Sequence, residues 1–232
     1  MKNQPTSVKR EELPRASKGL EIVNDTLIGI GTCTDTEIVI PDGITRIEEG
    51  AFDSFYNKHK ITSIIIPDSV KSIGRMAFSE CYYLKHCKIP SGVTRIEDDT
   101  FGFCHKLVEV EIPDSVTSIG DYAFNECVAL THIKMPDNVT HIGECAFFCC
   151  KELTELSIPH SVIEIGKWAF ANCTSLHTLT FEGTREQWKA IPKGDKWNLN
   201  CDFTSIHCAD GVIEGVEYPP KETIIYINTL NS

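Results

Sequence analysis

Several features of common protein classes are missing from this sequence of 232 residues. No apolar run approaches the roughly 20 residues that a membrane-spanning helix needs. The first twenty residues also lack the run of roughly 7–15 apolar residues that forms the core of a signal peptide. We therefore expect either that the chain stays in the cytoplasm or that an export signal was removed before this numbering begins.

The sequence is also short of positive charge. It contains 22 Lys and Arg residues against 33 Asp and Glu residues, which gives a formal net charge of −11 at pH 7. The basic residues are scattered along the chain instead of forming a basic stretch. Because such a chain repels phosphate backbones and anionic lipids, we expect neither nucleic acid nor a membrane surface as a partner.

Catalytic motifs are absent as well. The chain has no G-x-S-x-G elbow, no G-x-x-x-x-G-K-[ST] loop and no H-E-x-x-H helix. Carboxylates and histidines are abundant but evenly spaced, whereas an acid–base pair needs a dry concavity that shifts its pKa values. The sequence therefore predicts that the protein is not an enzyme and that it needs no cofactor.

What the chain does contain is an internal repeat. Pro113 recurs as Pro136, Phe124 as Phe147 and Cys127 as Cys150, each after 23 residues. A fixed period of this length indicates stacked units, each of which buries its apolar face against its neighbours. The prolines that mark the units stand at positions 41, 67, 90, 113, 136 and 159, and the longer first interval reflects an insertion within residues 53–60.

The pattern within one unit predicts one short strand per repeat. Apolar residues alternate just before each proline, as in Leu156-Ser-Ile158, and proline lacks the N–H that a continuing strand would need. Stacked strands at equal positions form a parallel sheet, about 25 Å across for six strands. The segment 116–120 is too short for a helix. Its glycine, Gly120, marks a tight bend that needs either a positive φ or a close backbone approach.

The eleven cysteines are numerous enough to suggest a disulfide framework, but their positions relative to the repeat favour another interpretation. Five of them recur at intervals of 23 residues, namely Cys81, Cys104, Cys127, Cys150 and Cys173. The repeat and not a pairing scheme sets these positions, so we interpret them as buried thiols. Free thiols in this number are compatible with a reducing compartment.

Four regions follow from these patterns. We expect a flexible leader at 1–19, an N-terminal cap at 20–37 with a hairpin around Asn24, a repeat array at 38–181, and a C-terminal cap and tail at 182–232. Thr184 and Gln187 form a capping-box pattern that predicts a short helix over 185–191, which lays Trp188 on the last repeat. Strands are expected at 203–208 and at 223–227.

The repeating unit LxxLxIPxxVxxIGxxAFxxCxx, seen over residues 130–150, resembles the BspA-like, Treponema-type class of leucine-rich repeat. The resemblance covers residues 38–181, with minor departures such as Glu97 at the glycine position and Thr100 at the alanine position. It implies a right-handed leucine-rich repeat solenoid of the α/β type, mostly β and capped at both ends. It also implies a protein that is often surface-exposed or secreted and that takes part in adhesion and in binding host or matrix proteins.

Strand positions that alternate with the buried ones should form two rows of polar side chains on the outer, concave side of the sheet. The candidate binding residues in these rows are His86, Lys88, Glu109, Glu111, His132, Lys134 and Glu155. One interpretation is that alternating charges only relieve repulsion between neighbouring strands. The other is that the rows form a polar recognition surface for a protein partner.

The sequence leaves two further alternatives. Metal binding could use His86 and His132 beside Glu109, or the cysteines at 145, 149 and 150, or Cys201 with residues 207–208. We predict no metal site, because no C-x-x-C pair occurs and stacked repeats hold side chains parallel instead of convergent. For the compartment, the alternative to an adhesion protein is an intracellular scaffold, which the missing signal peptide and the free thiols favour.

Overall fold

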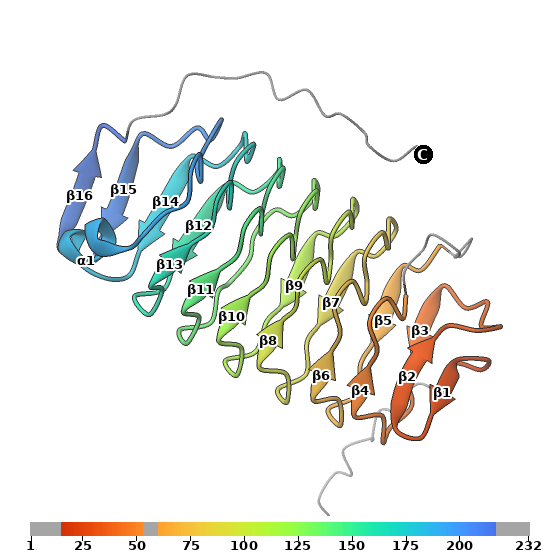
Figure 1. The fold of residues 1–232 in the computed structure, drawn as a ribbon. Coiled ribbons are helices and arrows are strands. Elements are labelled where there is room, and N and C mark those ends of the chain that lie inside the picture. The colour runs from red at the N-terminus through yellow and green to blue at the C-terminus, as the bar shows by residue number, and fades with distance from the viewer. Residues whose placement is uncertain (1–14, 53–59, 217–232) are drawn as a thin grey trace, which may run out of the picture.

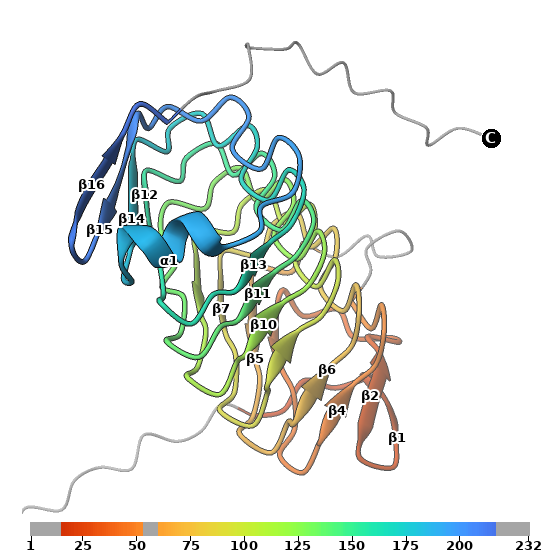
Figure 2. The same cartoon turned by 60° about the vertical axis from the view of Figure 1, so that its left-hand side comes forward.

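The computed structural model describes residues 15–52 and 60–216, which form an elongated stack of short strands (Figure 1). Residues 1–14 of the predicted leader, positions 53–59 of the insertion and the strand expected at 223–227 lie outside the described residues. The repeats follow one another along the stack as turns of one coil, and strands lie on two sides of this coil (Figure 2).

The first row contains the strands that precede the prolines, as the sequence predicts. β3 to β9 of this row form one parallel sheet, in which residues of neighbouring repeats face each other at equal positions, such as His86 and Glu109. The predicted leucine-rich repeat solenoid is thereby confirmed. The strands of this row are β3 (Glu37–Val39), β5 (Ser63–Ile65), β7 (His86–Lys88), β9 (Glu109–Glu111), β12 (Glu155–Ile158), β14 (Thr178–Phe181), β15 (Ser205–Cys208) and the antiparallel β16 (Gly211–Glu214).

A second row of strands lies on another side of the coil (Figure 2), so the repeats contain two strands and not the single one expected. These strands have two residues each, and their parallel pairs again join equal repeat positions, such as Ser118 with His141. Repeats of equal length bring these return segments side by side, where their main-chain N–H and C=O groups pair. The row consists of β4 (Arg46–Ile47), β6 (Ser72–Ile73), β8 (Arg95–Ile96), β10 (Ser118–Ile119), β11 (His141–Ile142) and β13 (Glu164–Ile165).

The first row is interrupted, which corrects the expectation of six continuous strands. Between β9 and β12 the segment 132–134 is not a strand, and β12 pairs only onward with β14. The neighbouring Thr131 still donates its main-chain N–H to the Val108 carbonyl at 3.3 Å. This repeat therefore stays stacked although its strand hydrogen bonds are missing.

The core of the stack is a column of phenylalanine rings. One ring from each repeat lies above the next, with ring centroids 5.2 Å apart for Phe124 and Phe147. These rings are fully buried and within the range in which aromatic pairs attract. The column contains Phe52, Phe78, Phe101, Phe124, Phe147 and Phe170, with successive centroids 5.2–5.6 Å apart.

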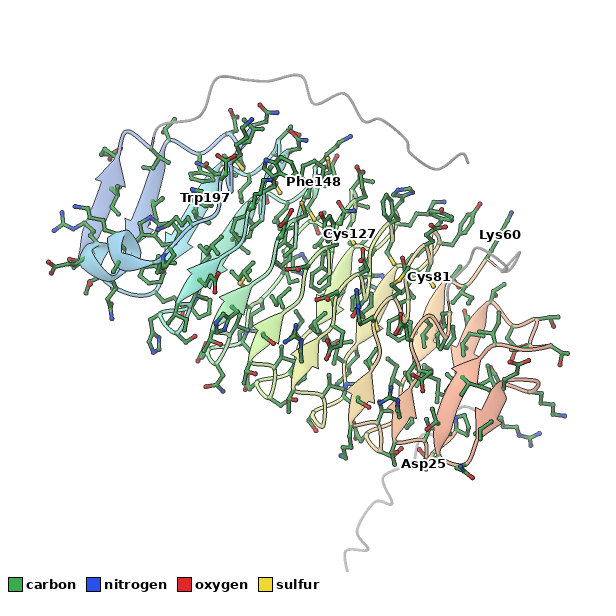
Figure 3. All side chains as sticks on the ribbon, in the orientation of Figure 1. Asp25, Lys60, Cys81, Cys127, Phe148 and Trp197 are labelled. Carbon is green, nitrogen blue, oxygen red and sulfur yellow. The ribbon has the colours of Figure 1, made fainter. Side chains whose placement is uncertain are left out.

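A column of cysteines runs beside the rings (Figure 3). The Cys127 thiol donates to the Phe101 carbonyl of the preceding repeat at 3.2 Å, and Cys104 donates to Phe78 in the same way at 3.1 Å. None of the eleven cysteines forms a disulfide, and ten of them are buried. The prediction of buried thiols in place of disulfides is confirmed.

The glycine at the bend of the repeat is needed for a close backbone approach. A Cβ on Gly120 would lie 2.7 Å from the Asp98 main-chain nitrogen and 2.8 Å from the Glu97 carbonyl carbon. At Gly143 the corresponding contact with the Asp121 nitrogen would be 2.6 Å. Neither glycine has a positive φ. Of the two expected reasons for glycine at this bend, the close backbone approach between successive repeats is therefore the correct one.

Both ends of the array are covered. β1 (Glu21–Val23) and β2 (Thr26–Gly29) form the expected antiparallel hairpin, with Asn24 at a φ of 55° in its turn. At the other end α1 (Arg185–Ala190) begins with the expected capping box, in which the Gln187 N–H donates to the Thr184 hydroxyl. α1 buries Trp188 beside Phe181, with ring centroids 5.2 Å apart.

Replacing Phe124 by alanine leaves a cavity and removes two ring contacts, so Phe124→Ala should lower the free energy of unfolding by about 3–5 kcal/mol. Equilibrium unfolding in denaturant measures this change. The control is Ile163→Ala, since that side chain is 57% exposed and its removal should change stability by no more than about 0.5 kcal/mol. Equal effects of the two substitutions would contradict the packing role of the column.

One carboxyl group lies in a strained and acidic place. Asp99 has a φ of 54°, in the left-handed region that disfavours residues with a Cβ. Partial burial, and then repulsion from Asp98 and Asp121, raise the pKa of Asp99 to about 6, although the nearby Arg75 opposes the shift. Between an ordinary carboxyl pKa near ~3.9 and ~6 the folded chain binds more protons than the unfolded chain, so stability falls as pH rises through this window.

Asp99→Asn should remove this loss, because asparagine has no charge and tolerates a positive φ. The variant should be more stable than the natural chain at about pH 7.5 and should lose most of that advantage at about pH 4.5. Thermal or denaturant unfolding at both pH values measures the difference. An advantage that is larger at the lower pH would have the wrong sign for a raised pKa.

Candidate interaction surface

The strands of the first row present alternate side chains to solvent. In β9 the central Val110 is buried, whereas Glu109 on one side of it is partly exposed and Glu111 on the other is exposed. We call the outward side chains of β3, β5, β7, β9, residues 132–134 and β12 the ladder face. All seven predicted binding residues lie on it: His86 and Lys88 on β7, Glu109 and Glu111 on β9, His132 and Lys134 in the interrupted repeat, and Glu155 at the start of β12.

Glu109 lies between two imidazoles. Its carboxylate is 4.0 Å from Nδ1 of His86 and 3.3 Å from Nε2 of His132, so three repeats are joined by one acidic side chain. These are ion pairs only when the imidazoles are protonated. The side chains are between 46% and 64% exposed, and pairs this exposed stabilise a fold by at most about 1 kcal/mol.

Within the ladder face, the ion pairs among Lys88, Glu111 and Lys134 are less regular than the alternating signs of these residues predict. Lys88 Nζ lies 3.4 Å from Glu111 Oε2, and their side chains are 75% and 63% exposed. Among the described residues, Lys134 has no ion pair, and neither has Glu155. The structure therefore joins His86, Glu109 and His132 in one set and Lys88 with Glu111 in another, while Lys134 and Glu155 stay separate.

The second row of strands forms a polar groove of about 650 Å³, which the repeat pattern did not predict. Two carboxylates of its lining already accept hydrogen bonds from main-chain N–H groups. Asp98 Oδ1 accepts the Asp121 N–H at 3.0 Å, and Asp121 Oδ1 accepts the Glu144 N–H at 2.8 Å. The signal that could have revealed the groove is the recurrence of a polar residue before the buried isoleucine, as in Ser118-Ile119 and His141-Ile142.

Chemistry on side chains has little support in the described part of the chain. No group of three His, Cys, Asp or Glu residues there is arranged to hold a metal ion. Burial raises the pKa of Cys87 to about 12 and that of Cys145 to about 11, and both shifts disfavour the nucleophilic thiolate. Burial also lowers the pKa of Lys193 to about 8, but its amine donates to the carbonyls of Trp188 and Ile191 at the end of α1.

Solved structures that are similar in fold include bacterial leucine-rich repeat proteins. A leucine rich repeat protein of T. pallidum, TpLRR, matches with a TM-score of 0.57 and 22% identity over 85% of this chain and 82% of that one. A leucine-rich repeat protein from Eubacterium ventriosum matches with a TM-score of 0.54 and 23% identity over 64% of this chain and 46% of that one. At these identities the likeness shows the fold alone. No curated protein matches the chain significantly.

The family model for the BspA type leucine rich repeat region matches six copies of the repeat, over residues 31–127 and 53–177. These matches cover more than half of the chain and the same repeats whose rings, thiols and glycines stack in the structure. No helix in the described residues has the length and hydropathy needed to cross a membrane. The chain belongs to the family of BspA type leucine rich repeat proteins.

Proposed function

We propose that the protein is a non-catalytic module that binds another protein through the ladder face. The observation that carries this proposal is the set of charged side chains on β7 and β9, which are 46–75% exposed although they stand on strands with fully buried centres. Rigid strands hold these groups at fixed lateral spacing, about 4.8 Å per repeat. Such a frame favours recognition by electrostatic complementarity, because its charged groups do not have to be reorganised on binding.

The charges contribute little to the fold, which supports a role outside it. The two imidazole contacts of Glu109 and the Lys88–Glu111 pair lie in water, where each stabilises by at most about 1 kcal/mol. Membership of a leucine-rich repeat family also favours protein interaction over catalysis. For the biological setting we propose adhesion or contact with host or matrix proteins.

An intracellular scaffold is the second candidate, and the absence of disulfides among the eleven cysteines favours it. Disulfides form in oxidising compartments and are rare in reducing ones. Localisation in the source cell separates the two settings. Exposure on the cell surface supports adhesion, whereas a purely cytosolic pool supports the scaffold.

The double substitution Glu109→Ala with Glu111→Ala tests the ladder face. Both side chains are about half-exposed or more, so the variant should unfold at nearly the same denaturant concentration as the natural chain. Its affinity for a partner captured with the natural chain should fall at least about tenfold, which corresponds to about 1.4 kcal/mol.

The matched control is Glu164→Ala, because Glu164 also faces an imidazole, that of His141 at 3.9 Å, but belongs to the second row of strands. The control should bind the partner as the natural chain does. If the double variant binds the partner with unchanged affinity, the proposal that the ladder face makes the contact is wrong.

A further inference from the structure

The ladder face changes character at its N-terminal end. The outward position that carries Lys88, Glu111 and Lys134 in later repeats is Ile65 in β5 and Val39 in β3. Ile65 is 47% exposed, although burial of a large aliphatic side chain away from water is favourable. The charged rows thus end beside an apolar surface that the fold leaves partly uncovered.

This surface is hollowed into a groove of about 520 Å³. Its apolar walls come from two neighbouring repeats, and polar side chains stand at its edge. A volume of this size lies within the range of ~300–1,000 Å³ that binding pockets occupy. The lining consists of Val39, Ile40, Pro41, Ile65, Ile66 and Pro67, with Ala16, Asp42, Asp68, Ser69 and Lys88 around them.

A partner cannot enter this groove by adding a strand to β3. The free edge of β3 is already bonded to Ser17, whose N–H donates to the Val39 carbonyl at 2.9 Å. The Val39 N–H in turn donates to the Ser17 hydroxyl at 3.0 Å. Strand addition needs unpaired main-chain groups, so recognition here must use side chains.

The edge of the groove carries unpaired negative charge. Asp42 and Asp68 are exposed at the start of successive turns, and among the described residues neither carboxylate has an ion pair. Lys71 donates to the main-chain carbonyl of Asp68 at 3.2 Å, not to its carboxylate. The turns are tied together, because the Ser69 hydroxyl accepts the Gly43 N–H at 3.2 Å and donates to the Ile44 carbonyl at 2.7 Å.

The charge on the edge selects the partner's chemistry. Among the described residues, Lys88 is the basic member of the lining, and it lies beside Glu111, which offsets its charge. The two unpaired carboxylates are therefore left to attract cations, in a chain whose net charge is −11. Apolar walls and an acidic edge together fit a ligand that is apolar at its centre and basic at its flanks.

We propose that this groove binds an extended protein segment in which a large aliphatic or aromatic side chain is flanked by Lys or Arg. The apolar side chain lies against Val39 and Ile65, and the basic groups meet Asp42 and Asp68. The inference rests on the proposed protein-binding function and names the partner chemistry that the N-terminal end of the ladder face recognises.

The test uses a fluorescent hexapeptide probe, acetyl-Gly-Lys-Leu-Phe-Lys-Gly-amide, and follows its anisotropy with the full chain. The probe should bind saturably with a Kd below about 1 mM at low salt. A peptide with Glu in place of both Lys, and one with Ser-Asn in place of Leu-Phe, should each bind at least about tenfold more weakly. Added salt should weaken the natural complex, because the Asp–Lys contacts are exposed.

Two variants locate the probe, each with a matched control. Ile65→Ser should weaken binding at least about tenfold, whereas Ile163→Ser removes an exposed isoleucine outside the groove and should change nothing. Asp42→Asn with Asp68→Asn should weaken binding and reduce its salt dependence. Asp114→Asn with Asp137→Asn, at the same turn position in later repeats, should do neither. If a variant misfolds, photo-cross-linking of the natural chain to a benzophenone-bearing probe still reports the contact residues.

Any of four results would overturn the inference. They are the absence of saturable binding at several times ~1 mM, equal binding of the acidic peptide, equal effects of Ile65→Ser and Ile163→Ser, and cross-links outside the groove. Its failure can be separated from failure of the ladder face. Glu109 lies outside the groove lining, so Glu109→Ala should leave probe binding unchanged. If the Ile65→Ser variant binds the captured protein partner normally and the Glu109 and Glu111 double variant does not, the role of the groove is refuted and that of the ladder face is not.

Discussion

The structure depends on main-chain hydrogen bonds that join each repeat to the next. At the turn that carries the rings, the Phe101 N–H donates to the Ala123 carbonyl at 2.9 Å and the Phe124 N–H donates to the Ala146 carbonyl at 2.8 Å. These bonds require repeats of equal length whose backbones nearly touch. Gly120 and Gly143 fit that requirement, because a Cβ at either position would lie less than 3.0 Å from the backbone of the preceding repeat.

The same constraint frees the outward positions for recognition. Because inward residues and main-chain bonds hold the stack together, residues such as Glu109 and Ile65 can vary without changing the fold. The ladder face uses this freedom twice. Its middle repeats carry paired charges, whereas its N-terminal repeats carry aliphatic side chains above a groove with an acidic edge. One rigid surface thus presents two kinds of chemistry side by side.

Local and periodic features could be predicted from the sequence. The buried thiols follow from the period of 23, the cap helix follows from Thr184 and Gln187, and the outward place of Glu109 follows from alternation in a strand. The second row of strands could not, because two-residue strands such as Ser118–Ile119 carry almost no pattern of their own. The interruption at 132–134 and the groove beside Ile65 depend on how neighbouring repeats lie in space, which periodicity does not encode.

Removal of one whole repeat tests the central claim most directly. Deleting residues 113–135 joins Ile112 to Pro136 and keeps every position of the repeat in register. If each repeat is held by its neighbours through equal positions, the shortened chain should unfold cooperatively in denaturant and be shorter in solution by about 4.8 Å, as small-angle X-ray scattering would measure. A shortened chain that is unfolded, or as long as the natural one, would contradict the account.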